Sequence, residues 1–538
     1  MLIRFYVVLL LLLSLAVEAQ VNRYVVFFRD KSGTPYSVNN PSGYLSQKAI
    51  ERRAAQGIAV TENDLPVNPA YIQSLTAVGA DVLFTSRWFN AALVNADISL
   101  LGSIASMSQV AAVELVAPDN PTTGGRNRAT KEQQSVQEEL TTAQLSMLGI
   151  DRMQADGFRG EGISIAIFDS GFSGVNVSAP FTSIFQENRF DQALSYNYVS
   201  PTSSVFNNDD HGTRVFSVIG ASIPETFTGG ALKANFSLFV TEDVSSEYRI
   251  EEYYWLLAAE RADSAGVDII NSSLGYNTFD LSSMNYARED MNGQTAVVSR
   301  AASLAADKGM LVVTSAGNEG ADARWRIITA PADADNVLAT GSVNSGGLRS
   351  GSSSTGPTSD NRIKPDVMAL GVATAVIRGN GQMAANSGTS FSAPLVTALA
   401  AGVWQRYPML KVNELIELIR STSSQADNPD NLNGYGIPNY NAIVNVMEPI
   451  QQTEQLAVFP NPVKEDAITL RVKEPGSLQQ VSYTLYTQHG QVIQSGNFQF
   501  SWSLPQYQID VSSVSSTLLL LQIKMDNQQR TYKIVRLR

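Results

Sequence analysis

The sequence predicts an α/β protein built on a mostly parallel sheet with helices on both faces. A small α+β unit precedes this region, and an all-β sandwich follows it. Two observations predict the order. Strand-like and helix-like runs alternate between about residues 143 and 447, which is typical of a parallel sheet covered by helices. After Met447 the alternation stops, and short strand-like runs separated by turns follow.

The composition excludes several classes of function. The 538 residues are 44% hydrophobic, enough for several domains with one sizeable core. The net charge of -12 indicates no excess of basic residues for binding phosphate groups, so we expect no nucleic-acid partner. The chain has no cysteine, which excludes disulfides and a thiol nucleophile. Its two histidines, His211 and His489, lie far apart, so a multi-histidine zinc site is not expected.

The first residues have the pattern of a secretory signal peptide. Arg4 precedes the apolar run Val7–Val17, and a small residue, Ala19, marks the cleavage site. A membrane anchor is the alternative, but the run is too short to span a bilayer comfortably. We therefore predict a signal peptide over 1–19 and no stable membrane span.

Residues 20–118 are predicted to form the small α+β unit. The expected strands are Tyr24–Phe28, Asp81–Thr85, Trp88–Val94 and Val110–Val116, and the expected helices are Tyr44–Gln56, Pro69–Val78 and Ile98–Met107. Such a unit could be a free-standing binding module. Residues 119–140, however, are polar and rich in Pro, Gly and Asn, which is typical of an exposed, protease-accessible linker. We place a processing site there.

Residues 141–448 carry the α/β pattern, and 455–538 the β-sandwich pattern. In the first region a buried strand, Ile163–Phe168, ends at Asp169. Carboxyl ends of such strands are where open α/β sheets place their sites. A further strand at Val267–Leu274 ends in Gly275, and another at Met310–Ser315 ends in Gly317-Asn318. The C-terminal region shows no chemistry, and His489 is expected in an exposed turn.

A candidate nucleophile lies in the stretch Gly388–Pro394. Ser390 lies between a glycine-containing turn and a run of small residues, which indicates a hydroxyl at the start of a closely packed helix. The small residues are Ala393, Ala398, Ala400, Ala401 and Gly402. Pro394 fits a first helical turn, whose N–H groups lack intrahelical partners. The alternative is a simple capped, buried helix.

A hydroxyl nucleophile needs a base beside it, and the base needs a carboxylate to fix its tautomer. His211 is effectively the only imidazole available, and it stands just before a helix. The helix dipole disfavours imidazolium there, so a carboxylate is required. Asp169 can supply it. Asp209 and Asp210 are rivals, but next to a helix start they are more simply caps.

A donor for the oxyanion is the fourth requirement. Asn318 follows a predicted strand and lies between glycines, which allow close approach to a substrate. Its alternative is an ordinary turn asparagine. The backbone N–H of Ser390 would be the second donor.

Five ordered blocks resemble the signatures of the subtilisin-like serine proteases. They are Asp169-Ser170-Gly171, His211-Gly212-Thr213, Ser272-Ser273-Leu274-Gly275, Ala316-Gly317-Asn318 and Gly388-Thr389-Ser390-Phe391-Ser392-Ala393-Pro394. The chain order Asp, His, Ser is that of subtilisin. Ser170 stands where threonine is more usual, and the rival Gly-x-Ser-x-Gly signature is absent.

The resemblance implies a subtilisin-like fold, a triad of Asp169, His211 and Ser390, and Asn318 as oxyanion donor. It also implies two segments that line the substrate backbone: Ser272, Ser273, Leu274 and Gly275, and Ser315, Ala316 and Gly317. Many relatives bind calcium, but no ligand cluster is assigned in this sequence and no other cofactor is expected.

The flanks resemble other parts of such enzymes. Residues 20–118 look like an inhibitor-type propeptide that is cut away. The C-terminal region, with Phe459-Pro460-Asn461-Pro462 and the basic end Lys533–Arg536, is similar to the sorting domains of type IX secretion in Bacteroidetes-type bacteria. The partners implied are protein or peptide substrates, the protein's own propeptide and the secretion machinery, and the location is outside a Gram-negative cell or on its surface.

The sequence therefore predicts a secreted serine endopeptidase made as an autoinhibited zymogen and acting through an acyl-enzyme. A catalytically silent binding protein with the same fold is one alternative. An esterase using the same triad is the other.

Overall fold

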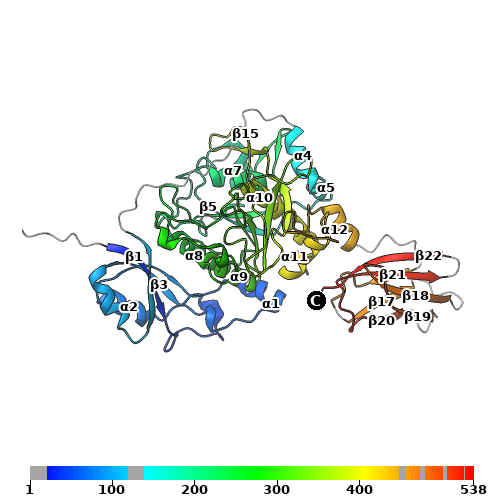
Figure 1. Cartoon of the computed structure of the whole chain (residues 1–538), viewed down its shortest axis with the longest axis horizontal. Coiled ribbons are helices and arrows are strands. Elements are labelled where there is room, and N and C mark those ends of the chain that lie inside the picture. Colours follow the sequence, from blue (N-terminus) through cyan, green and yellow to red (C-terminus); the bar gives the residue numbers. More distant parts are fainter. Residues whose placement is uncertain are drawn as a thin grey trace, which may run out of the picture. The chain divides into compact units, whose positions relative to one another are not determined.

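The computed structural model of the chain describes residues 21–118, 139–447, 456–464, 466–472, 479–500, 506–525 and 528–537 (Figure 1). The predicted signal peptide and nearly all of the predicted linker lie outside these ranges. The chain divides into two compact units. One comprises Met1–Val38 and Glu62–Thr122, and the other comprises Asn39–Thr61 and Thr123–Arg538. Residues 39–61, which interrupt the predicted α+β unit, therefore group with the larger unit.

The smaller unit contains a four-stranded antiparallel sheet in the order β2-β3-β1-β4. Its elements are β1 (Val21–Phe28), α2 (Pro69–Ala77), β2 (Asp81–Ser86), β3 (Ala91–Asp97), α3 (Leu101–Ala105) and β4 (Val110–Ala117). Val26, Leu75 and Ile104 lie in its hydrophobic core. The strand predicted to start at Trp88 starts at Ala91, because residues 87–90 form a turn with Asn90 at φ 49°.

The larger unit is built on a seven-stranded sheet in the order β13-β12-β11-β10-β5-β9-β6, and all neighbouring strands pair in parallel. The strands are β5 (Ser164–Asp169), β6 (Tyr196–Asn197), β9 (Asn235–Val240), β10 (Ile269–Ser272), β11 (Leu311–Ser315), β12 (Val337–Val343) and β13 (Val367–Leu370). Nearly every residue of the central strands is buried, as expected for a sheet covered on both faces. The predicted parallel sheet is confirmed.

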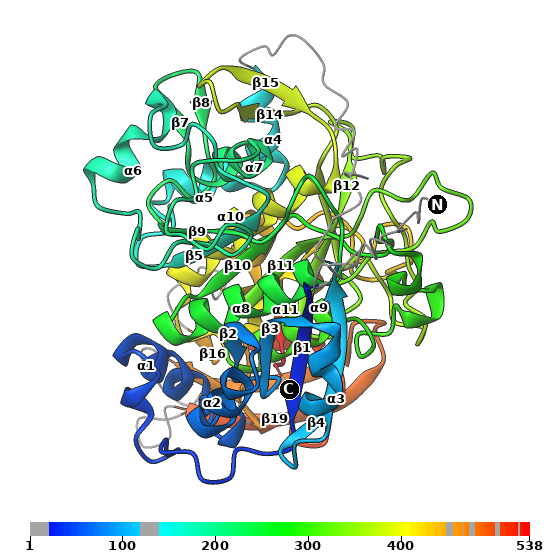
Figure 2. The same ribbon diagram turned by 90° about the vertical axis from the view of Figure 1, so that its left-hand side faces the viewer.

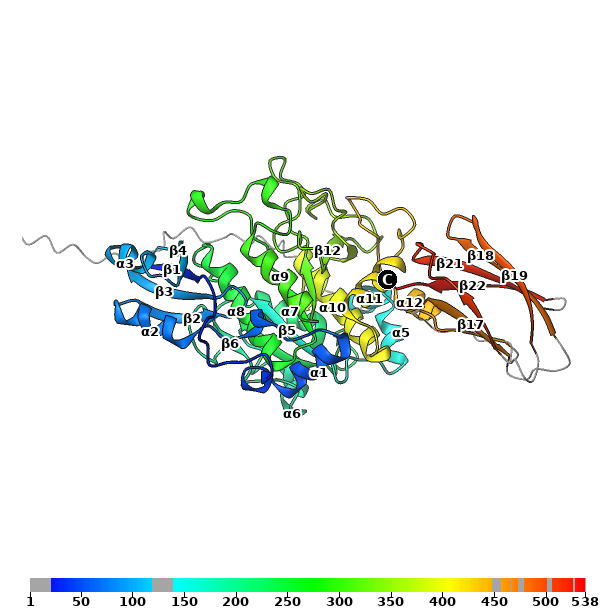
Figure 3. The ribbon, with the colours of Figure 1, turned by 90° about the horizontal axis from the view of Figure 1, so that it is seen from below.

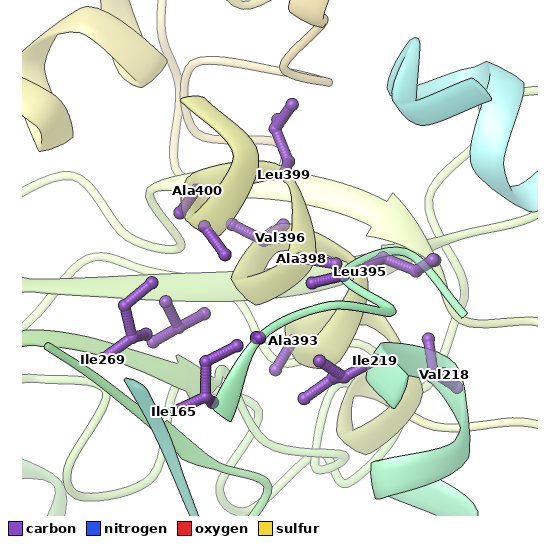
Figure 4. Packing of buried hydrophobic residues seen from close by; sticks show 14 of the residues in the cluster. Ile165, Val218, Ile219, Ile269, Ala393, Leu395, Val396, Ala398, Leu399 and Ala400 are labelled. Carbon is purple, nitrogen blue, oxygen red and sulfur yellow. The ribbon is translucent and has the colours of Figure 1, made fainter. Parts of the chain in front are cut away.

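Helices cover both faces of this sheet. Figure 2 shows α7 (His211–Gly220) and α10 (Thr389–Arg406) on one side of β5, β10 and β11, and α8 (Ile250–Ala265) and α9 (Val297–Asp307) on the other. Figure 4 shows Ala393, Val396 and Ala400 of α10 close to strand residues such as Ile165 and Ile269. Small side chains let α10 lie close to the strands, so its first turn is held firmly in place.

The remaining elements of the larger unit are shorter or lie at its margins. The helices are α1 (Gln47–Gln56), α4 (Glu139–Met147), α5 (Ile150–Ala155), α6 (Thr182–Gln186), α11 (Val412–Ser421) and α12 (Tyr440–Met447). The strands are β7 (Ser222–Ile223), β8 (Phe227–Thr228), β14 (Thr374–Ile377) and β15 (Met383–Asn386), which form two antiparallel pairs.

The C-terminal residues form two antiparallel sheets (Figure 3). One contains β16 (Leu456–Phe459), β17 (Ala467–Val472) and β20 (Gln506–Asp510), and the other β18 (Gln479–Thr487), β19 (Val492–Phe500), β21 (Leu518–Met525) and β22 (Gln528–Val535). Buried residues of both sheets, including Ile468 and Leu521, share one core, which confirms the predicted sandwich. His489 is exposed, as expected. No helix in the described ranges is both long and apolar enough to cross a membrane.

Candidate active site

The predicted catalytic residues come from three elements that meet at the carboxyl edge of the parallel sheet. Asp169 is the last residue of β5, His211 is the first residue of α7, and Ser390 is the second residue of α10. Helices α7 and α10 pack against each other and against the same sheet. Residues more than two hundred positions apart are therefore brought to one site.

The Asp169 carboxylate holds the imidazole of His211. Its Oδ1 lies 2.7 Å from His211 Nδ1, and the backbone N–H of Ser170 donates to the same oxygen at 2.8 Å. Asp169 is fully buried. Because a carboxylate accepts, Nδ1 carries the proton and Nε2 is left as the acceptor of a neutral ring. This is the tautomer that a general base requires.

A glycine after the histidine allows this contact. A Cβ on Gly212 would lie 2.5 Å from Gly171 O and 2.8 Å from the Cβ of Asp169. Both separations are shorter than normal van der Waals contacts, so any larger residue would push α7 away from the end of β5. The sequence His211-Gly212 therefore has a steric reason as well as a chemical one.

The rival aspartates have other partners. Asp210 Oδ1 pairs with Arg214 Nη2 at 2.8 Å, and its side chain makes no capping hydrogen bond to α7. The predicted cap is therefore wrong for Asp210, because the ion pair one turn further along takes up its carboxylate. Asp209 accepts hydrogen bonds from the Ser170 hydroxyl at 2.9 Å and from the Asp210 N–H at 2.8 Å.

Ser390 lies in a helix start that differs from the expected one. Pro394 is the sixth residue of α10, not part of its first turn. A proline there has no N–H for the carbonyl four residues earlier, which is that of Ser390. This carbonyl instead accepts the Ser273 hydroxyl at 2.8 Å, while Ser390 Oγ donates to Ser273 O at 3.3 Å. Because Pro394 has no N–H, the Ser390 carbonyl is free to bind Ser273, in the segment after β10.

The ring of His211 lies next to this helix start. Its centroid is 5.7 Å from that of Phe391, the residue after Ser390. Ser390 itself is 7% exposed, so its hydroxyl lies in a largely desolvated position.

Asn318 is oriented by the residue before Ser390. Its Oδ1 accepts hydrogen bonds from Thr389 N at 2.9 Å and Thr389 Oγ1 at 3.1 Å. Because a backbone N–H can only donate, the carboxamide oxygen must face Thr389 and Nδ2 must face the other way. The amide is therefore available as a donor beside Ser390, which an unconstrained turn asparagine would not guarantee.

The two predicted substrate segments lie side by side. Ser315 Oγ donates to Leu274 O at 3.2 Å, which links the end of β11 to the segment after β10. Ser272 belongs to β10, and its hydroxyl accepts from Trp255 Nε1 of α8 at 2.9 Å. Its side chain therefore serves the sheet–helix packing, whereas Ser273 contacts Ser390 directly.

Sequence reasoning missed one acidic group near these segments. Glu242, Glu247 and Glu251 are buried, with carboxylate oxygens within 4.8 Å of one another. Tyr276, which follows Gly275, donates its hydroxyl to Glu242, and burial and that carboxylate raise the pKa of Tyr276 well above its usual value. Carboxylate oxygens suit a hard cation. The proximity of the three carboxylates is the only observation that points to an ion, so none is assigned. The available signal was three acidic residues spaced five and four positions apart, the last of them in the first turn of α8.

Comparison with protein families identifies the family to which this region belongs. Residues 160–436 match the family model of the Subtilase family, over the region that carries all five sequence blocks. The chain belongs to the subtilase family. Residues 23–136 of this subtilase match a Peptidase S8 propeptide domain of Bacteroidota, and residues 457–536 match a secretion system C-terminal sorting domain. It is a serine-type endopeptidase with a propeptide domain, and its sorting domain indicates a secreted or cell-surface protein.

Individual relatives agree. The chain is 26% identical to subtilisin DY of Bacillus licheniformis over 280 residues, which cover 52% of this chain and 90% of that protein. It is 27% identical to subtilisin E of Bacillus subtilis over 288 residues, 53% of this chain and 66% of that protein. The structure of an epidermin leader peptide processing serine protease from Staphylococcus aureus is similar, with a TM-score of 0.57 and 16% identity. It covers 79% of this chain and 99% of that one, and supports the fold alone.

Proposed function

We propose that this subtilase cleaves peptide bonds through an acyl-enzyme formed on Ser390, with His211 as general base and Asp169 as its orienting carboxylate. The observation that carries the proposal is the buried 2.7 Å hydrogen bond between Asp169 and His211 beside the start of α10. An ion pair that forms as the ring takes a proton is stabilised most where water is excluded.

The reaction begins with a turn of the Ser390 hydroxyl. In the resting arrangement Oγ donates to Ser273 O at 3.3 Å, a long hydrogen bond that costs little to break. Oγ then donates to His211 Nε2, and its attack on the substrate carbonyl forms the C–O bond while the proton moves to Nε2. Collapse of the tetrahedral intermediate returns this proton to the leaving amine. Water then repeats both steps and releases the acid.

Two donors would bind the oxyanion of that intermediate. Asn318 Nδ2 is turned away from Thr389 by the hydrogen bonds to its Oδ1. The Ser390 N–H lies in the first turn of α10, where backbone N–H groups have no intrahelical acceptor. Donors fixed before the charge develops stabilise it without reorganising.

The substrate would lie between the two polar strand ends. Residues Ser273–Gly275 and Ser315–Gly317 lie at the carboxyl ends of the paired parallel strands β10 and β11. Ser273 contacts Ser390, and Ser315 links the two segments. An extended peptide can add to such segments through main-chain hydrogen bonds, with alternate side chains in pockets. The substrates are thus protein or peptide chains.

The flanking domains fit a zymogen exported by type IX secretion. In this proposal the signal peptide 1–19 directs export from the cytoplasm, and the propeptide inhibits the enzyme until the 119–140 segment is cut. The sorting domain then engages the secretion machinery of a Bacteroidetes-type Gram-negative cell. The supporting findings are the Bacteroidota propeptide match and the sorting-domain match. The intact mass of the exported protein would report both trimming events.

Burst kinetics test the proposed chemistry. The matured protein should release one equivalent of nitrophenol rapidly from a p-nitrophenyl ester, then turn over more slowly, and it should also cleave a peptide anilide. Ser390→Ala should abolish both. No burst and no peptide cleavage in matured protein would favour a silent binding protein, and ester cleavage alone would favour an esterase.

A further inference from the structure

A helix within the matched propeptide region packs with the catalytic unit. The propeptide match spans 23–136, yet residues 39–61 belong to the unit that holds the active site. Helix α1 begins after Ser46, which caps it by accepting from Ala49 N, and ends at Gly57 with φ 72°. This segment is therefore a defined helical element of the larger unit.

Two adjacent arginines of α1 form ion pairs with one aspartate of α8. Arg52 Nη2 and Arg53 Nη2 donate to the two carboxylate oxygens of Asp263, at 2.5 and 2.7 Å. Arg52 Nη1 also donates to Val267 O at 2.5 Å. The side chains are 5%, 1% and 0% exposed for Arg52, Arg53 and Asp263. Ion pairs this deeply buried are scarcely screened by salt, and the loss of one partner leaves an uncompensated charge.

Both ends of α1 reach the amino edge of the parallel sheet. Lys48 Nζ donates to Ser164 Oγ at 2.5 Å and pairs with Asp268 at 3.2 Å, at the starts of β5 and β10. Gln56 Nε2 donates to Gly309 O at 2.7 Å, and its Oε1 accepts from Val412 N at 3.2 Å. Helix α1 therefore lies beside the end of α9 and the start of α11 (Figure 1). The catalytic residues lie at the opposite edge, where these strands end.

The approach is close enough to require a glycine. A Cβ on Gly266, which follows α8 at φ +83°, would lie 2.7 Å from Ala49 N. The catalytic unit thus accommodates this helix sterically, through Gly266, and binds it electrostatically, through Asp263.

We propose that the amino edge of the sheet is an exosite that recognises the double-arginine helix α1. The exosite keeps the propeptide on the enzyme after the linker is cut, and so sets the rate at which inhibition is relieved. This inference rests on the proposed zymogen function. The exosite recognises a helix with two adjacent arginines, whose guanidinium groups bind the same buried carboxylate.

The test measures how long the cut propeptide stays bound. A full-length chain carrying Ser390→Ala, with a specific protease site inserted in 119–138, is cleaved, and release of the propeptide is followed by size exclusion and by competition with labelled chain. Arg53→Gln should shorten the residence time about ten- to a hundredfold, the range for a hydrogen bond to a charged group. Arg29→Gln is the matched control, since Arg29 is exposed and its Nε makes only an exposed hydrogen bond to Ser108 O.

Asp263→Asn supplies the reciprocal variant. It should shorten the residence time similarly, and the double variant should be no worse than either single one. Equal residence times for Arg53→Gln and Arg29→Gln, or fully additive losses in the double variant, would overturn the exosite. Because the readout is residence time in an inactive background, failure of the proposed chemistry would appear elsewhere, as wild-type protein without peptide cleavage.

Thr329 lies beside both proposed substrate segments and affects which substrates fit there. Thr329 is held between the two substrate segments: its N–H donates to Ala316 O at 3.2 Å, and Ala330 pairs with Tyr276 through two backbone hydrogen bonds of 2.8 and 3.2 Å. Its hydroxyl would collide with a Cβ on Gly275 and would lie 2.8 Å from one on Gly317. Thr329 is buried, and among the described residues its Oγ1 has no hydrogen-bond partner.

We infer that Thr329 closes the floor of the pocket beside these glycines and restricts the residue before the cleaved bond to small, uncharged side chains. This inference also rests on the proposed function. A rigid side chain between two backbone walls leaves no depth for an aromatic ring, and a hydroxyl offers no counter-charge.

Peptide anilides that differ only in the residue before the cleaved bond test this inference. Wild-type kcat/KM should favour Ala over Phe, Thr329→Gly should move the ratio towards Phe by tenfold or more, and Thr329→Val should keep the wild-type ratio because it keeps the size. A wild-type enzyme that prefers Phe would overturn the inference without affecting the proposed chemistry. Absence of any cleavage would instead contradict the proposed chemistry.

Discussion

The two edges of the parallel sheet use buried aspartates in opposite ways. At the carboxyl edge Asp169 has one imidazole partner, and within the described residues its Oδ2 makes no hydrogen bond. At the amino edge Asp263 has two guanidinium partners, one on each oxygen. An imidazole gains and loses its proton near neutral pH, whereas a guanidinium stays charged. The carboxylate that must respond to a proton is thus paired with a titratable ring, and the one that must hold a segment is paired with fixed charges.

Exchanging each aspartate for asparagine should separate these roles most clearly. Asp169→Asn should lower kcat by about ten-thousandfold, because an amide can stabilise the wrong imidazole tautomer. Asp263→Asn should leave kcat of the matured enzyme unchanged. Peptide hydrolysis by the two matured variants, with circular dichroism to check folding, measures both. Equal losses of kcat would contradict the contrast between the edges.

Removal of the carboxamide of Asn318 should have the next largest effect. Asn318→Ala should lower kcat about a hundred- to a thousandfold with KM nearly unchanged, because the amide would act only on the charge formed in the transition state. Steady-state kinetics on one peptide substrate check this. A raised KM with normal kcat would mean that Asn318 binds the ground state, as an ordinary turn residue near a substrate could.

Helix α8 links the two edges, and its first turn offers a third test. Burial raises the pKa of Glu252 to about 7, although hydrogen bonds from Tyr286 and Val298 N lower it. In the unfolded chain this carboxyl loses its proton near pH 4.5. The folded state therefore keeps a proton between these values, and the free energy of unfolding should fall as pH rises from about 4.5 to 7.

Glu252→Gln should remove that slope. Relative to the variant, the wild-type protein should lose on the order of 3 kcal/mol across this window. Urea unfolding at several pH values measures the difference, and Asp263→Asn is the control, since its partners stay charged throughout. Parallel curves for wild type and Glu252→Gln would contradict burial as the dominant influence on this carboxyl.

The smallest expected effect concerns the carbonyl that Pro394 leaves without a helical donor. Ser273→Ala would remove the hydroxyl that donates to Ser390 O. The cost should be about 1–3 kcal/mol of unfolding free energy, typical of a buried acceptor left unsatisfied. Thermal unfolding of the variant checks this, with Ser108→Ala, at an exposed position, as reference.

Much of the carboxyl edge was predictable because its chemistry fixes residue types at strand ends. Asp169 ends a buried strand, Asn318 follows another, and His211 begins a helix, and the hydrophobic pattern already marks these elements. The position of Pro394 was predicted wrongly, because the sequence does not state where α10 begins. That depends on Asn318 binding Thr389, a contact across about seventy residues.

The amino edge could not be predicted in the same way. Arg52 and Arg53 read as solvated charges on a helix, and Asp263 as an ordinary surface acid. They become buried only when α1 packs against α8, which lies more than two hundred residues further along the chain. No local sequence pattern predicts that pairing. Thr329 is similar, since its importance comes from two glycines that the fold brings beside it.

Covalent labelling shows whether Ser390 is the nucleophile. Matured protein is treated with a fluorophosphonate probe, digested, and the modified residue identified by mass spectrometry. We expect one label, on Ser390, which is lost in His211→Ala and weak before the propeptide is removed. A label on a different serine, or none on matured and folded protein, would contradict Ser390 as the nucleophile.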